Sequence, residues 1–359
     1  MKPVVTFVVG SLLLVGAGCK SVGPKTIARD RFDYSASISE SWKRQTLLNI
    51  VKLRYLDPPI FVDVGQIVSG YSLELGLNAG GSLPESSVMG GSTAMLGGSA
   101  KFTDRPTITY TPLTGDKFVR ALMTPLRPES VFSTIEAGWP ADAILFLTTK
   151  RINRLRNQEA SAAGINKADP RFLRALELLR RIQEADAVTV RVEEDPRSRQ
   201  SVLVVLRSKD ITEAALADCR ELRQLLGLSG EVSEFKLAFG AAPTSDRELA
   251  VQTRSLLHIL TLLAAQVEVP PEHVAQHLAS PGIVEANQEG PPVVSLARIR
   301  SATSRPAAPY VAVTYRGHWF WIDDNDLKSK RTFAFMMMLF TLADSGGKEA
   351  PPMITIPAQ

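Results

Sequence analysis

The sequence has few of the side chains that most often act as nucleophiles, proton carriers or metal ligands, because its 359 residues include only two cysteines and four histidines. Cys219 shares one helical stripe with Ala215, Leu222 and Leu226. This spacing predicts a small side chain buried in a core, so a reactive thiol is disfavoured at this position. The other cysteine, Cys19, follows a strongly apolar stretch near the N-terminus.

The few histidines do not form a zinc-protease motif. His273 and His277 are four residues apart, as on one helix face, but Glu272 precedes the pair, whereas the motif places its glutamate after the first histidine. Two histidines alone cannot fill a tetrahedral zinc site. We therefore expect no metal ion and no other cofactor.

Fingerprints of catalysis and nucleotide binding are also missing. There is no Gly-x-Ser-x-Gly elbow, no P-loop and no Gly-x-Gly-x-x-Gly between a strand and a helix. Asp323, Asp324 and Asp326 cluster without the spacing of a calcium loop, so we expect helix capping from them. These absences favour a protein that is not an enzyme.

Excess charge is small, since the formal net charge is only +4. Basic clusters such as Lys150, Arg151 and Arg154 have no recognised nucleic-acid-binding module beside them. We expect solvated helix faces there and no nucleic-acid partner, with contact to anionic lipid headgroups as the functional alternative.

The apolar run over residues 4–15 is too short for a comfortable transmembrane helix, which needs about 20 apolar residues. A lysine precedes the run, and small residues at 16–18 separate it from Cys19, which is the layout of a secretory signal peptide. The stretch from Leu14 to Cys19 resembles the lipobox of bacterial lipoproteins, with Gly16 where that family usually has leucine.

This resemblance implies that residues 1–18 are a lipoprotein signal peptide and that Cys19 is lipidated, which would anchor the chain in a membrane. With Cys19 lipidated, Cys219 has no partner for an intramolecular disulfide. Lys20 stands where an aspartate marks retention in the inner membrane of proteobacteria. The resemblance therefore implies the outer membrane, on its periplasmic side.

The chain is predicted to fold as α+β, with mainly antiparallel sheet and packed helices. Residues 19–36 are predicted to be a tether, 37–160 a region of helix, β-hairpin and further helices, and 168–359 a C-terminal α+β domain. Within that domain, caps and periodicity predict helices over four segments. They are residues 170–184, 212–226, 246–266 and about 325–343.

Residues 69–111 predict a long β-hairpin rich in glycine and serine. Each arm alternates apolar with small or polar residues and has roughly the 9–11 residues of a tilted membrane-crossing strand. One hairpin cannot span alone, because its open edges would leave backbone groups unpaired in lipid. Several subunits in a ring would close those edges. The simpler alternative is a hairpin that packs on the fold or projects into water.

Consecutive aromatic residues mark a second hairpin, whose strands 310–315 and 318–322 are joined at Arg316-Gly317. Alternation sends Trp319 and Trp321 to one face and Phe320 to the other. A ligand-binding site is one interpretation. Its candidate residues are Arg316, His318, Trp319, Asp323 and Asp324. The alternative is a structural sheet whose two tryptophans are packed under the apolar helix around residues 333–340.

Two segments resemble a family of uncharacterised predicted lipoproteins of proteobacteria. They are Leu47–Tyr55 with Asp57-Pro58, and Tyr315–Asp324 continuing into Ser329–Phe333. The resemblance covers most of the mature chain. It implies the lipid-anchored address and carries no activity.

Three hypotheses follow. The leading one is a lipid-anchored, non-enzymatic envelope lipoprotein with a structural or assembly role, partnered by the membrane through Cys19 and by copies of itself or other envelope proteins. The second is a periplasmic enzyme or small-ligand binder that uses the C-terminal hairpin. The third is an oligomeric pore component of the outer membrane that uses the hairpin at 69–111.

Overall fold

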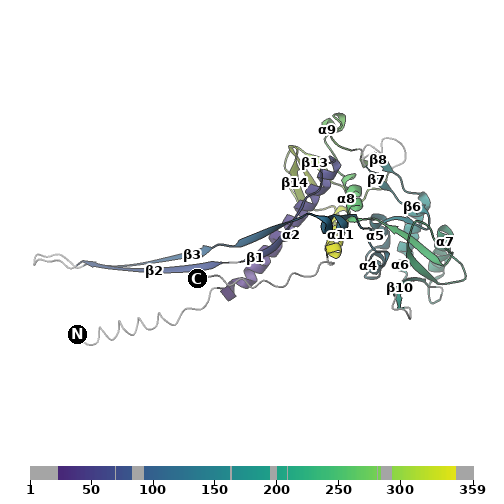
Figure 1. Cartoon of the computed structure of the whole chain (residues 1–359), viewed down its shortest axis with the longest axis horizontal. Coiled ribbons are helices and arrows are strands. Elements are labelled where there is room, and N and C mark those ends of the chain that lie inside the picture. Colours follow the sequence, from purple (N-terminus) through teal and green to yellow (C-terminus); the bar gives the residue numbers. More distant parts are fainter. Residues whose placement is uncertain are drawn as a thin grey trace, which may run out of the picture. The chain divides into compact units, whose positions relative to one another are not determined.

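Helices alternate with mostly antiparallel sheets in the computed structural model, so the predicted α+β class is confirmed (Figure 1). The structure describes residues 23–68, 70–82, 93–161, 164–194, 200–207, 209–280, 282–283 and 293–344. The predicted signal peptide and Cys19 lie outside these residues. No helix in the described part is both long and apolar enough to cross a bilayer.

The chain divides into two compact units at places other than those predicted. Unit 1 comprises residues 1–41 with 62–112, and unit 2 comprises 42–61 with 113–359. A division around residue 160 was expected from the small, polar sequence there. It does not occur, because strand β5 (Thr149–Ile152) pairs with a strand about 100 residues later in the same sheet.

Helix α2 runs from Gly23 to Arg54, so the described part of the predicted tether at 19–36 is helical instead. A proline in the first turn is tolerated, because the N–H that it lacks has no acceptor there, and Pro24 is therefore compatible with a helix start. The predicted boundary between the tether and the helical region, at residue 37, therefore lies within α2.

The predicted long hairpin in unit 1 is confirmed, and it consists of β2 (Tyr71–Ser82) and β3 (Thr93–Asp104). The two strands pair antiparallel without a break from Tyr71–Asp104 to Ser82–Thr93. Strand β4 (Thr107–Leu113) does not extend this hairpin as expected. It pairs instead with β1 (Phe61–Val68) in a separate two-stranded sheet.

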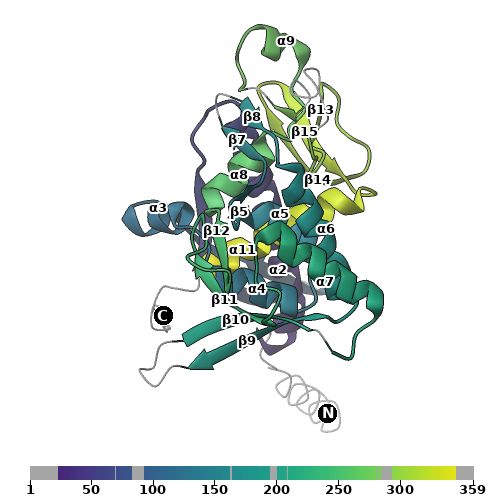
Figure 2. The ribbon, with the colours of Figure 1, turned by 90° about the vertical axis from the view of Figure 1, so that its right-hand side faces the viewer.

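Unit 2 is built on a six-stranded sheet in the order β6-β5-β12-β11-β10-β9, in which only β11 and β12 are parallel. Helices α6 and α7 lie side by side, and α4 packs on the sheet (Figure 2). The elements up to the end of this sheet are α3 (Asp116–Met123), α4 (Pro128–Glu136), α5 (Ala141–Thr148), β6 (Leu155–Arg156), β7 (Glu159–Ser161), β8 (Gly164–Asn166), α6 (Pro170–Glu184), β9 (Val188–Glu194), β10 (Gln200–Leu206), α7 (Glu213–Leu226), β11 (Glu234–Phe239) and β12 (Glu248–Thr253).

Helices α6 and α7 match their predicted bounds because their ends are encoded locally. Asp169 caps α6 by accepting from the backbone N–H of Arg171, and Thr212 caps α7. Gly227 ends α7 with φ +64°, a left-handed conformation that favours glycine. Cys219 is fully buried on α7, as predicted, and burial raises the pKa of its thiol.

The prediction of one long helix over residues 246–266 is wrong. Its first part is β12, a central strand whose residues Leu249–Val251 are buried, and its second part is α8 (Leu256–Ala264). A fully buried strand is apolar on both faces, so its sequence does not alternate and imitates a helix. Arg254 stands at the junction and is itself fully buried.

The C-terminal part of unit 2 contains α9 (Pro271–Ala275), β13 (Arg300–Ala302), β14 (Pro309–Tyr315), β15 (His318–Asp323) and α11 (Leu327–Asp344). The three strands form one sheet in the order β13-β15-β14. Phe333, Met336 and Leu339 of α11 are buried, which confirms the expected core helix. Asp326 caps α11, since it accepts from the backbone N–H of Ser329 at 3.0 Å.

Candidate functional site

Three chain segments of unit 2 meet at the turn end of the β14–β15 hairpin. The first is the end of α2, where the chain turns at Leu56 with φ +61° before two prolines that cannot continue the helix. The second is the short helix α9, which begins at Pro271. The third is the hairpin turn, in which Arg316 and Gly317 both have positive φ.

A ring of aromatic contacts surrounds Tyr55. Its hydroxyl lies 2.7 Å from Nδ1 of His273, and the centroids of the two rings are 5.6 Å apart. Tyr315 and Phe320 pack on the same tyrosine, with ring centroids at 5.4 and 6.2 Å. Tyr55 is buried by these neighbours, and it positions the imidazole of His273.

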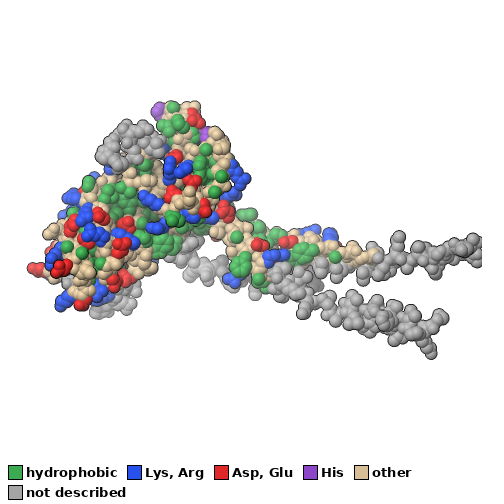
Figure 3. All heavy atoms as spheres, turned by 180° about the vertical axis from the view of Figure 1, so that it is seen from behind, with side chains coloured by type: hydrophobic (Ala, Val, Ile, Leu, Met, Phe, Trp, Pro, Cys, Tyr) green, Lys and Arg blue, Asp and Glu red, His purple; other side chains and the backbone are tan. Residues whose placement is uncertain are grey.

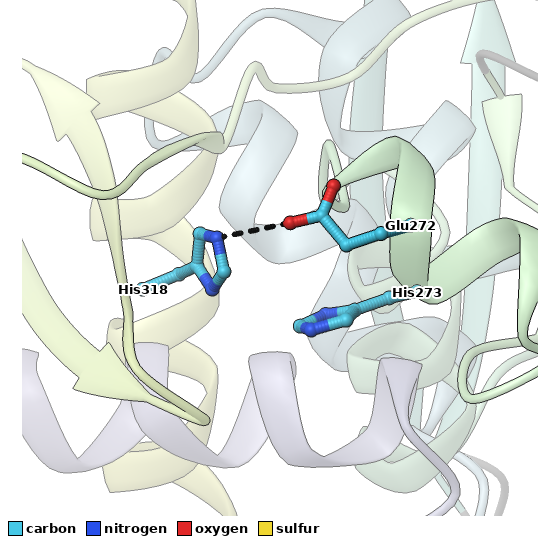
Figure 4. Close-up of side chains that lie close together, drawn as sticks. All are labelled: Glu272, His273 and His318. Carbon is cyan, nitrogen blue, oxygen red and sulfur yellow. Dashed lines mark ion pairs between the residues drawn. The ribbon is translucent and has the colours of Figure 1, made fainter.

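His318 lies beside His273, with the two imidazole rings edge to face at 5.1 Å (Figure 4). Nε2 of His318 is 3.4 Å from a carboxylate oxygen of Glu272, and its Nδ1 is 3.2 Å from the backbone carbonyl of Arg316. We call Tyr55, Glu272, His273 and His318 the histidine cluster.

Tyr55 keeps its proton throughout the neutral range. Burial raises the pKa of Tyr55 to about 12, although the guanidinium groups of Arg316 and Arg54 oppose this shift. Arg316 lies over the Tyr55 ring at 5.0 Å and pairs with Asp57 at 3.5 Å. Tyr315 also donates a hydrogen bond to Asp57, which ties the end of α2 to β14.

The structure brings together only two of the five residues predicted for a ligand site. His318 belongs to the histidine cluster, and Arg316 lies directly beside it. Trp319 and Asp323 belong to the opposite face of β15 by strand alternation, since His318 and the fully buried Phe320 share the inner face.

The two tryptophans are partly buried and have polar neighbours of their own. Trp319 lies under Arg305 at 5.7 Å, and Trp321 donates from Nε1 to Asp323 at 2.8 Å. Neither is among the described side chains that pack against the hydrophobic core, so the expected packing of the two tryptophans under α11 is not seen. Asp324, the last predicted site residue, is exposed and pairs with Lys330 at 2.7 Å.

Sequence reasoning missed three members of the cluster. Tyr55 lay inside an apparently structural helix, and His273 was paired with His277, which is exposed outside the cluster. Glu272 was used only to reject a protease motif. The available signal was that the sequence has only four histidines, so any two of them that meet in space are informative.

A separate hollow of about 860 Å³ lies elsewhere in unit 2, between α5, α6 and α11. Its walls include Trp139, Phe146, Leu173 and Phe335, so they are largely apolar. The volume falls in the range of small-molecule pockets. None of the five predicted ligand-site residues lines it.

Searches for relatives gave no match among protein-family models, curated proteins or solved structures. Within the molecule, the segment around Asp57 and the segment around Tyr315 are in contact, since Tyr315 and Arg316 reach Asp57. They are more than 250 residues apart in the sequence, and they form the surroundings of the histidine cluster.

Proposed function

We propose that this chain is a lipid-anchored component of the bacterial cell envelope with a structural or assembly role. The lipobox-like sequence that ends at Cys19 supports the anchor, and the resemblance to predicted lipoproteins supports the same address. In this proposal Cys19 attaches the chain to the outer membrane on its periplasmic side, and unit 1 makes contact with other subunits or envelope proteins.

One observation carries the assembly role: unit 1 has no hydrophobic core among its described side chains. Every buried hydrophobic residue in the described part of the chain belongs to unit 2. Unit 1 instead exposes large apolar side chains (Figure 3). They are Ile27, Phe32, Val68, Phe102, Ile108 and Tyr110, with exposed fractions from 37% to 74%. An isolated two-stranded hairpin is only marginally stable in water, so binding of a partner to these apolar side chains would stabilise unit 1.

In the β2–β3 hairpin, the register places apolar residues opposite one another. Residues directly opposite each other in an antiparallel pair share a face. Leu73 lies opposite Phe102 and Leu75 opposite Ala100, whereas Glu74 lies opposite Lys101 on the other face. By register, apolar and polar residues therefore occupy alternate pairs along this part of the hairpin, as in an amphipathic ribbon.

The same ribbon supports a second candidate, an oligomeric pore component that uses residues 69–111. The specific observation is the uninterrupted pairing of two 12-residue strands, which is long enough for a tilted strand to cross a bilayer. In the described sheet each strand has only one partner, so both outer edges are open to a neighbouring subunit. This candidate requires a ring made of copies of the chain.

The test is cross-linking of the detergent-extracted, tagged chain, followed by identification of the cross-linked species. Ala100→Glu with Phe102→Glu charges the apolar face, and Ser72→Glu with Thr103→Glu charges the polar face as a matched control. We expect cross-linked complexes that disappear only in the first pair. Rings of the chain alone favour the pore, other envelope proteins favour assembly, and monomers in every sample contradict both.

The anchor is tested separately. Cys19→Ser should abolish metabolic labelling by fatty acid and release the chain from membranes, because the thiol is the point of lipid attachment. Mass spectrometry of the mature N-terminus should find acylated Cys19. A mature chain that begins at another residue without lipid would overturn the address.

A further inference from the structure

Glu272, His273 and His318 bring three ligand atoms together at the surface of unit 2. Each residue offers one imidazole nitrogen or carboxylate oxygen, and these atoms all lie within 4.8 Å of one another. Glu272 and His273 come from α9, and His318 comes from β15 (Figure 4). Two imidazoles with one carboxylate are a ligand set that zinc uses with an open fourth position.

Both histidines have the supporting contacts that metal ligands need. A metal-binding histidine usually donates its second ring N–H to a nearby oxygen, which fixes the tautomer and orients the ring. Nδ1 of His318 lies 3.2 Å from the Arg316 carbonyl, and Nδ1 of His273 lies 2.7 Å from the Tyr55 hydroxyl. With Nδ1 engaged in this way, Nε2 of each ring is the nitrogen left for a metal.

The separations suit zinc after a small adjustment. Zinc bonds of about 2.0–2.2 Å in a tetrahedron place the ligand atoms roughly 3.3–3.6 Å apart. Nε2 of His318 and the Glu272 oxygen are already 3.4 Å apart. No separation exceeds 4.8 Å, so closing to a tetrahedron needs a shift of at most on the order of 1–1.5 Å, and the half-exposed Glu272 side chain has room to move.

The surrounding charges do not exclude a cation. The guanidinium of Arg316 lies over the Tyr55 ring, but it pairs with Asp57, which offsets its charge. The Arg54 guanidinium is engaged as well, since it donates to the carbonyl of Ser280. A simple ion pair of protonated His318 with Glu272 would account for their separation, but it gives no role to the oriented imidazole of His273.

We propose that Glu272, His273 and His318 bind one Zn²⁺ ion, with Tyr55 as a positioning residue that orients His273. Three protein ligands leave a coordination position for water or an external ligand. This inference is independent of the proposed envelope role, since neither the lipid anchor nor the hairpin of unit 1 takes part in it.

The test is titration of the purified, chelator-treated full chain with Zn²⁺ by calorimetry, with Co²⁺ as a spectroscopic probe. We expect one Zn²⁺ per chain and visible Co²⁺ bands of a tetrahedral site. Mg²⁺ should not bind, because it prefers an octahedral shell of oxygen ligands. His273→Asn or His318→Asn should abolish the bands, and Tyr55→Phe should weaken Zn²⁺ binding about 10–100-fold.

His277→Asn is the matched control, since His277 follows α9 closely but lies outside the cluster. It should leave affinity and spectrum unchanged. Thermal unfolding of every variant in chelator checks that the fold is kept. Failure of the unaltered chain to bind Zn²⁺, or equal affinity in both histidine variants, would overturn the proposal.

Discussion

Units 1 and 2 solve the problem of apolar side chains in opposite ways. Unit 2 buries them around a six-stranded sheet and its helices, and it also buries polar groups, among them Arg254 and Asn157. Unit 1 leaves large apolar side chains such as Phe32 and Tyr110 exposed. Burial of apolar surface is the main favourable term in folding. Unit 2 therefore has the means to be stable alone, whereas the proposed role of unit 1 is to bury its apolar side chains against partners.

The difference also shows in how polar contacts are used. In unit 2, Asn157 donates to the carbonyls of Phe146 and Thr149 at 2.7 Å, and such buried bonds fix one arrangement of the chain. In unit 1, the cross-strand pair of Glu74 and Lys101 is 3.8 Å long and exposed, so it adds little. Substitutions should therefore be costly in unit 2 and tolerated in unit 1.

The largest effect is expected for Arg254→Ala in unit 2. Its guanidinium donates to the carbonyls of Phe146, Leu147 and Gln158, and all of these groups are buried. Removing it takes a donor away from three buried carbonyls, of which that of Phe146 keeps a second donor in Asn157, and it opens a cavity. This should cost about 3–5 kcal/mol in the free energy of unfolding. Urea denaturation measures this, with the exposed Arg247→Ala as control. A loss equal to that of the control would contradict the comparison.

A moderate effect is expected for Gly227→Ala at the end of α7. The added Cβ meets no neighbour within 4 Å, so the cost comes only from the left-handed backbone at φ +64°. We expect about 1–2 kcal/mol of destabilisation. Gly230→Ala, which lies in the same loop with equally open surroundings and no positive φ, is the control. The two variants should differ in midpoint of urea unfolding and not in slope.

A smaller effect concerns pH, and it should be confined to unit 2, because all four histidines lie there. Burial lowers the pKa of His258 below its usual 6.5, and the nearby Arg254 and Lys150 act in the same direction. The unfolded chain therefore binds a proton that the folded chain resists. The contribution of His258 is full above pH 6.5 and is lost as the pH falls from there through the lowered pKa.

The measurement is the free energy of unfolding between about pH 7.5 and about pH 5, which covers the range in which histidine side chains titrate. His258→Gln should flatten this part of the profile. In unit 1, hydrogen exchange of the backbone amides of the β2–β3 hairpin should not change over the same pH range once the rates are corrected for the intrinsic pH dependence of exchange. A profile unaffected by His258→Gln would contradict this assignment.

The smallest effect is expected for Phe102→Ser in unit 1. The side chain is half-exposed and stacks on Tyr71, with ring centroids 5.9 Å apart. The free energy of unfolding of unit 2 should change by less than about 0.5 kcal/mol. Lys101→Ser on the opposite face serves as control. A large loss of stability would show that Phe102 belongs to a core, and the contrast between the units would fail.

The sequence by itself determined the elements whose signals are local. Helices α6 and α7 were found to the residue or nearly so, because their caps and apolar stripes lie within the segments themselves. The β2–β3 hairpin was found through its period of two, and the β14–β15 turn through Arg316-Gly317. Each of these depends on residues close in the chain, so neighbouring residues suffice to predict them.

Tertiary structure decided the rest. Residues 248–253 form a strand because two neighbouring strands pair with them, and their apolar sequence alone did not distinguish strand from helix. Which face of β15 is buried depends on the side chains that pack against it, and Tyr55 packs against Phe320 on the buried face. The histidine cluster joins residues 55, 272–273 and 318, and no local spacing encodes their meeting. Such contacts depend on the packing of the whole chain, which a pattern read along the sequence does not contain.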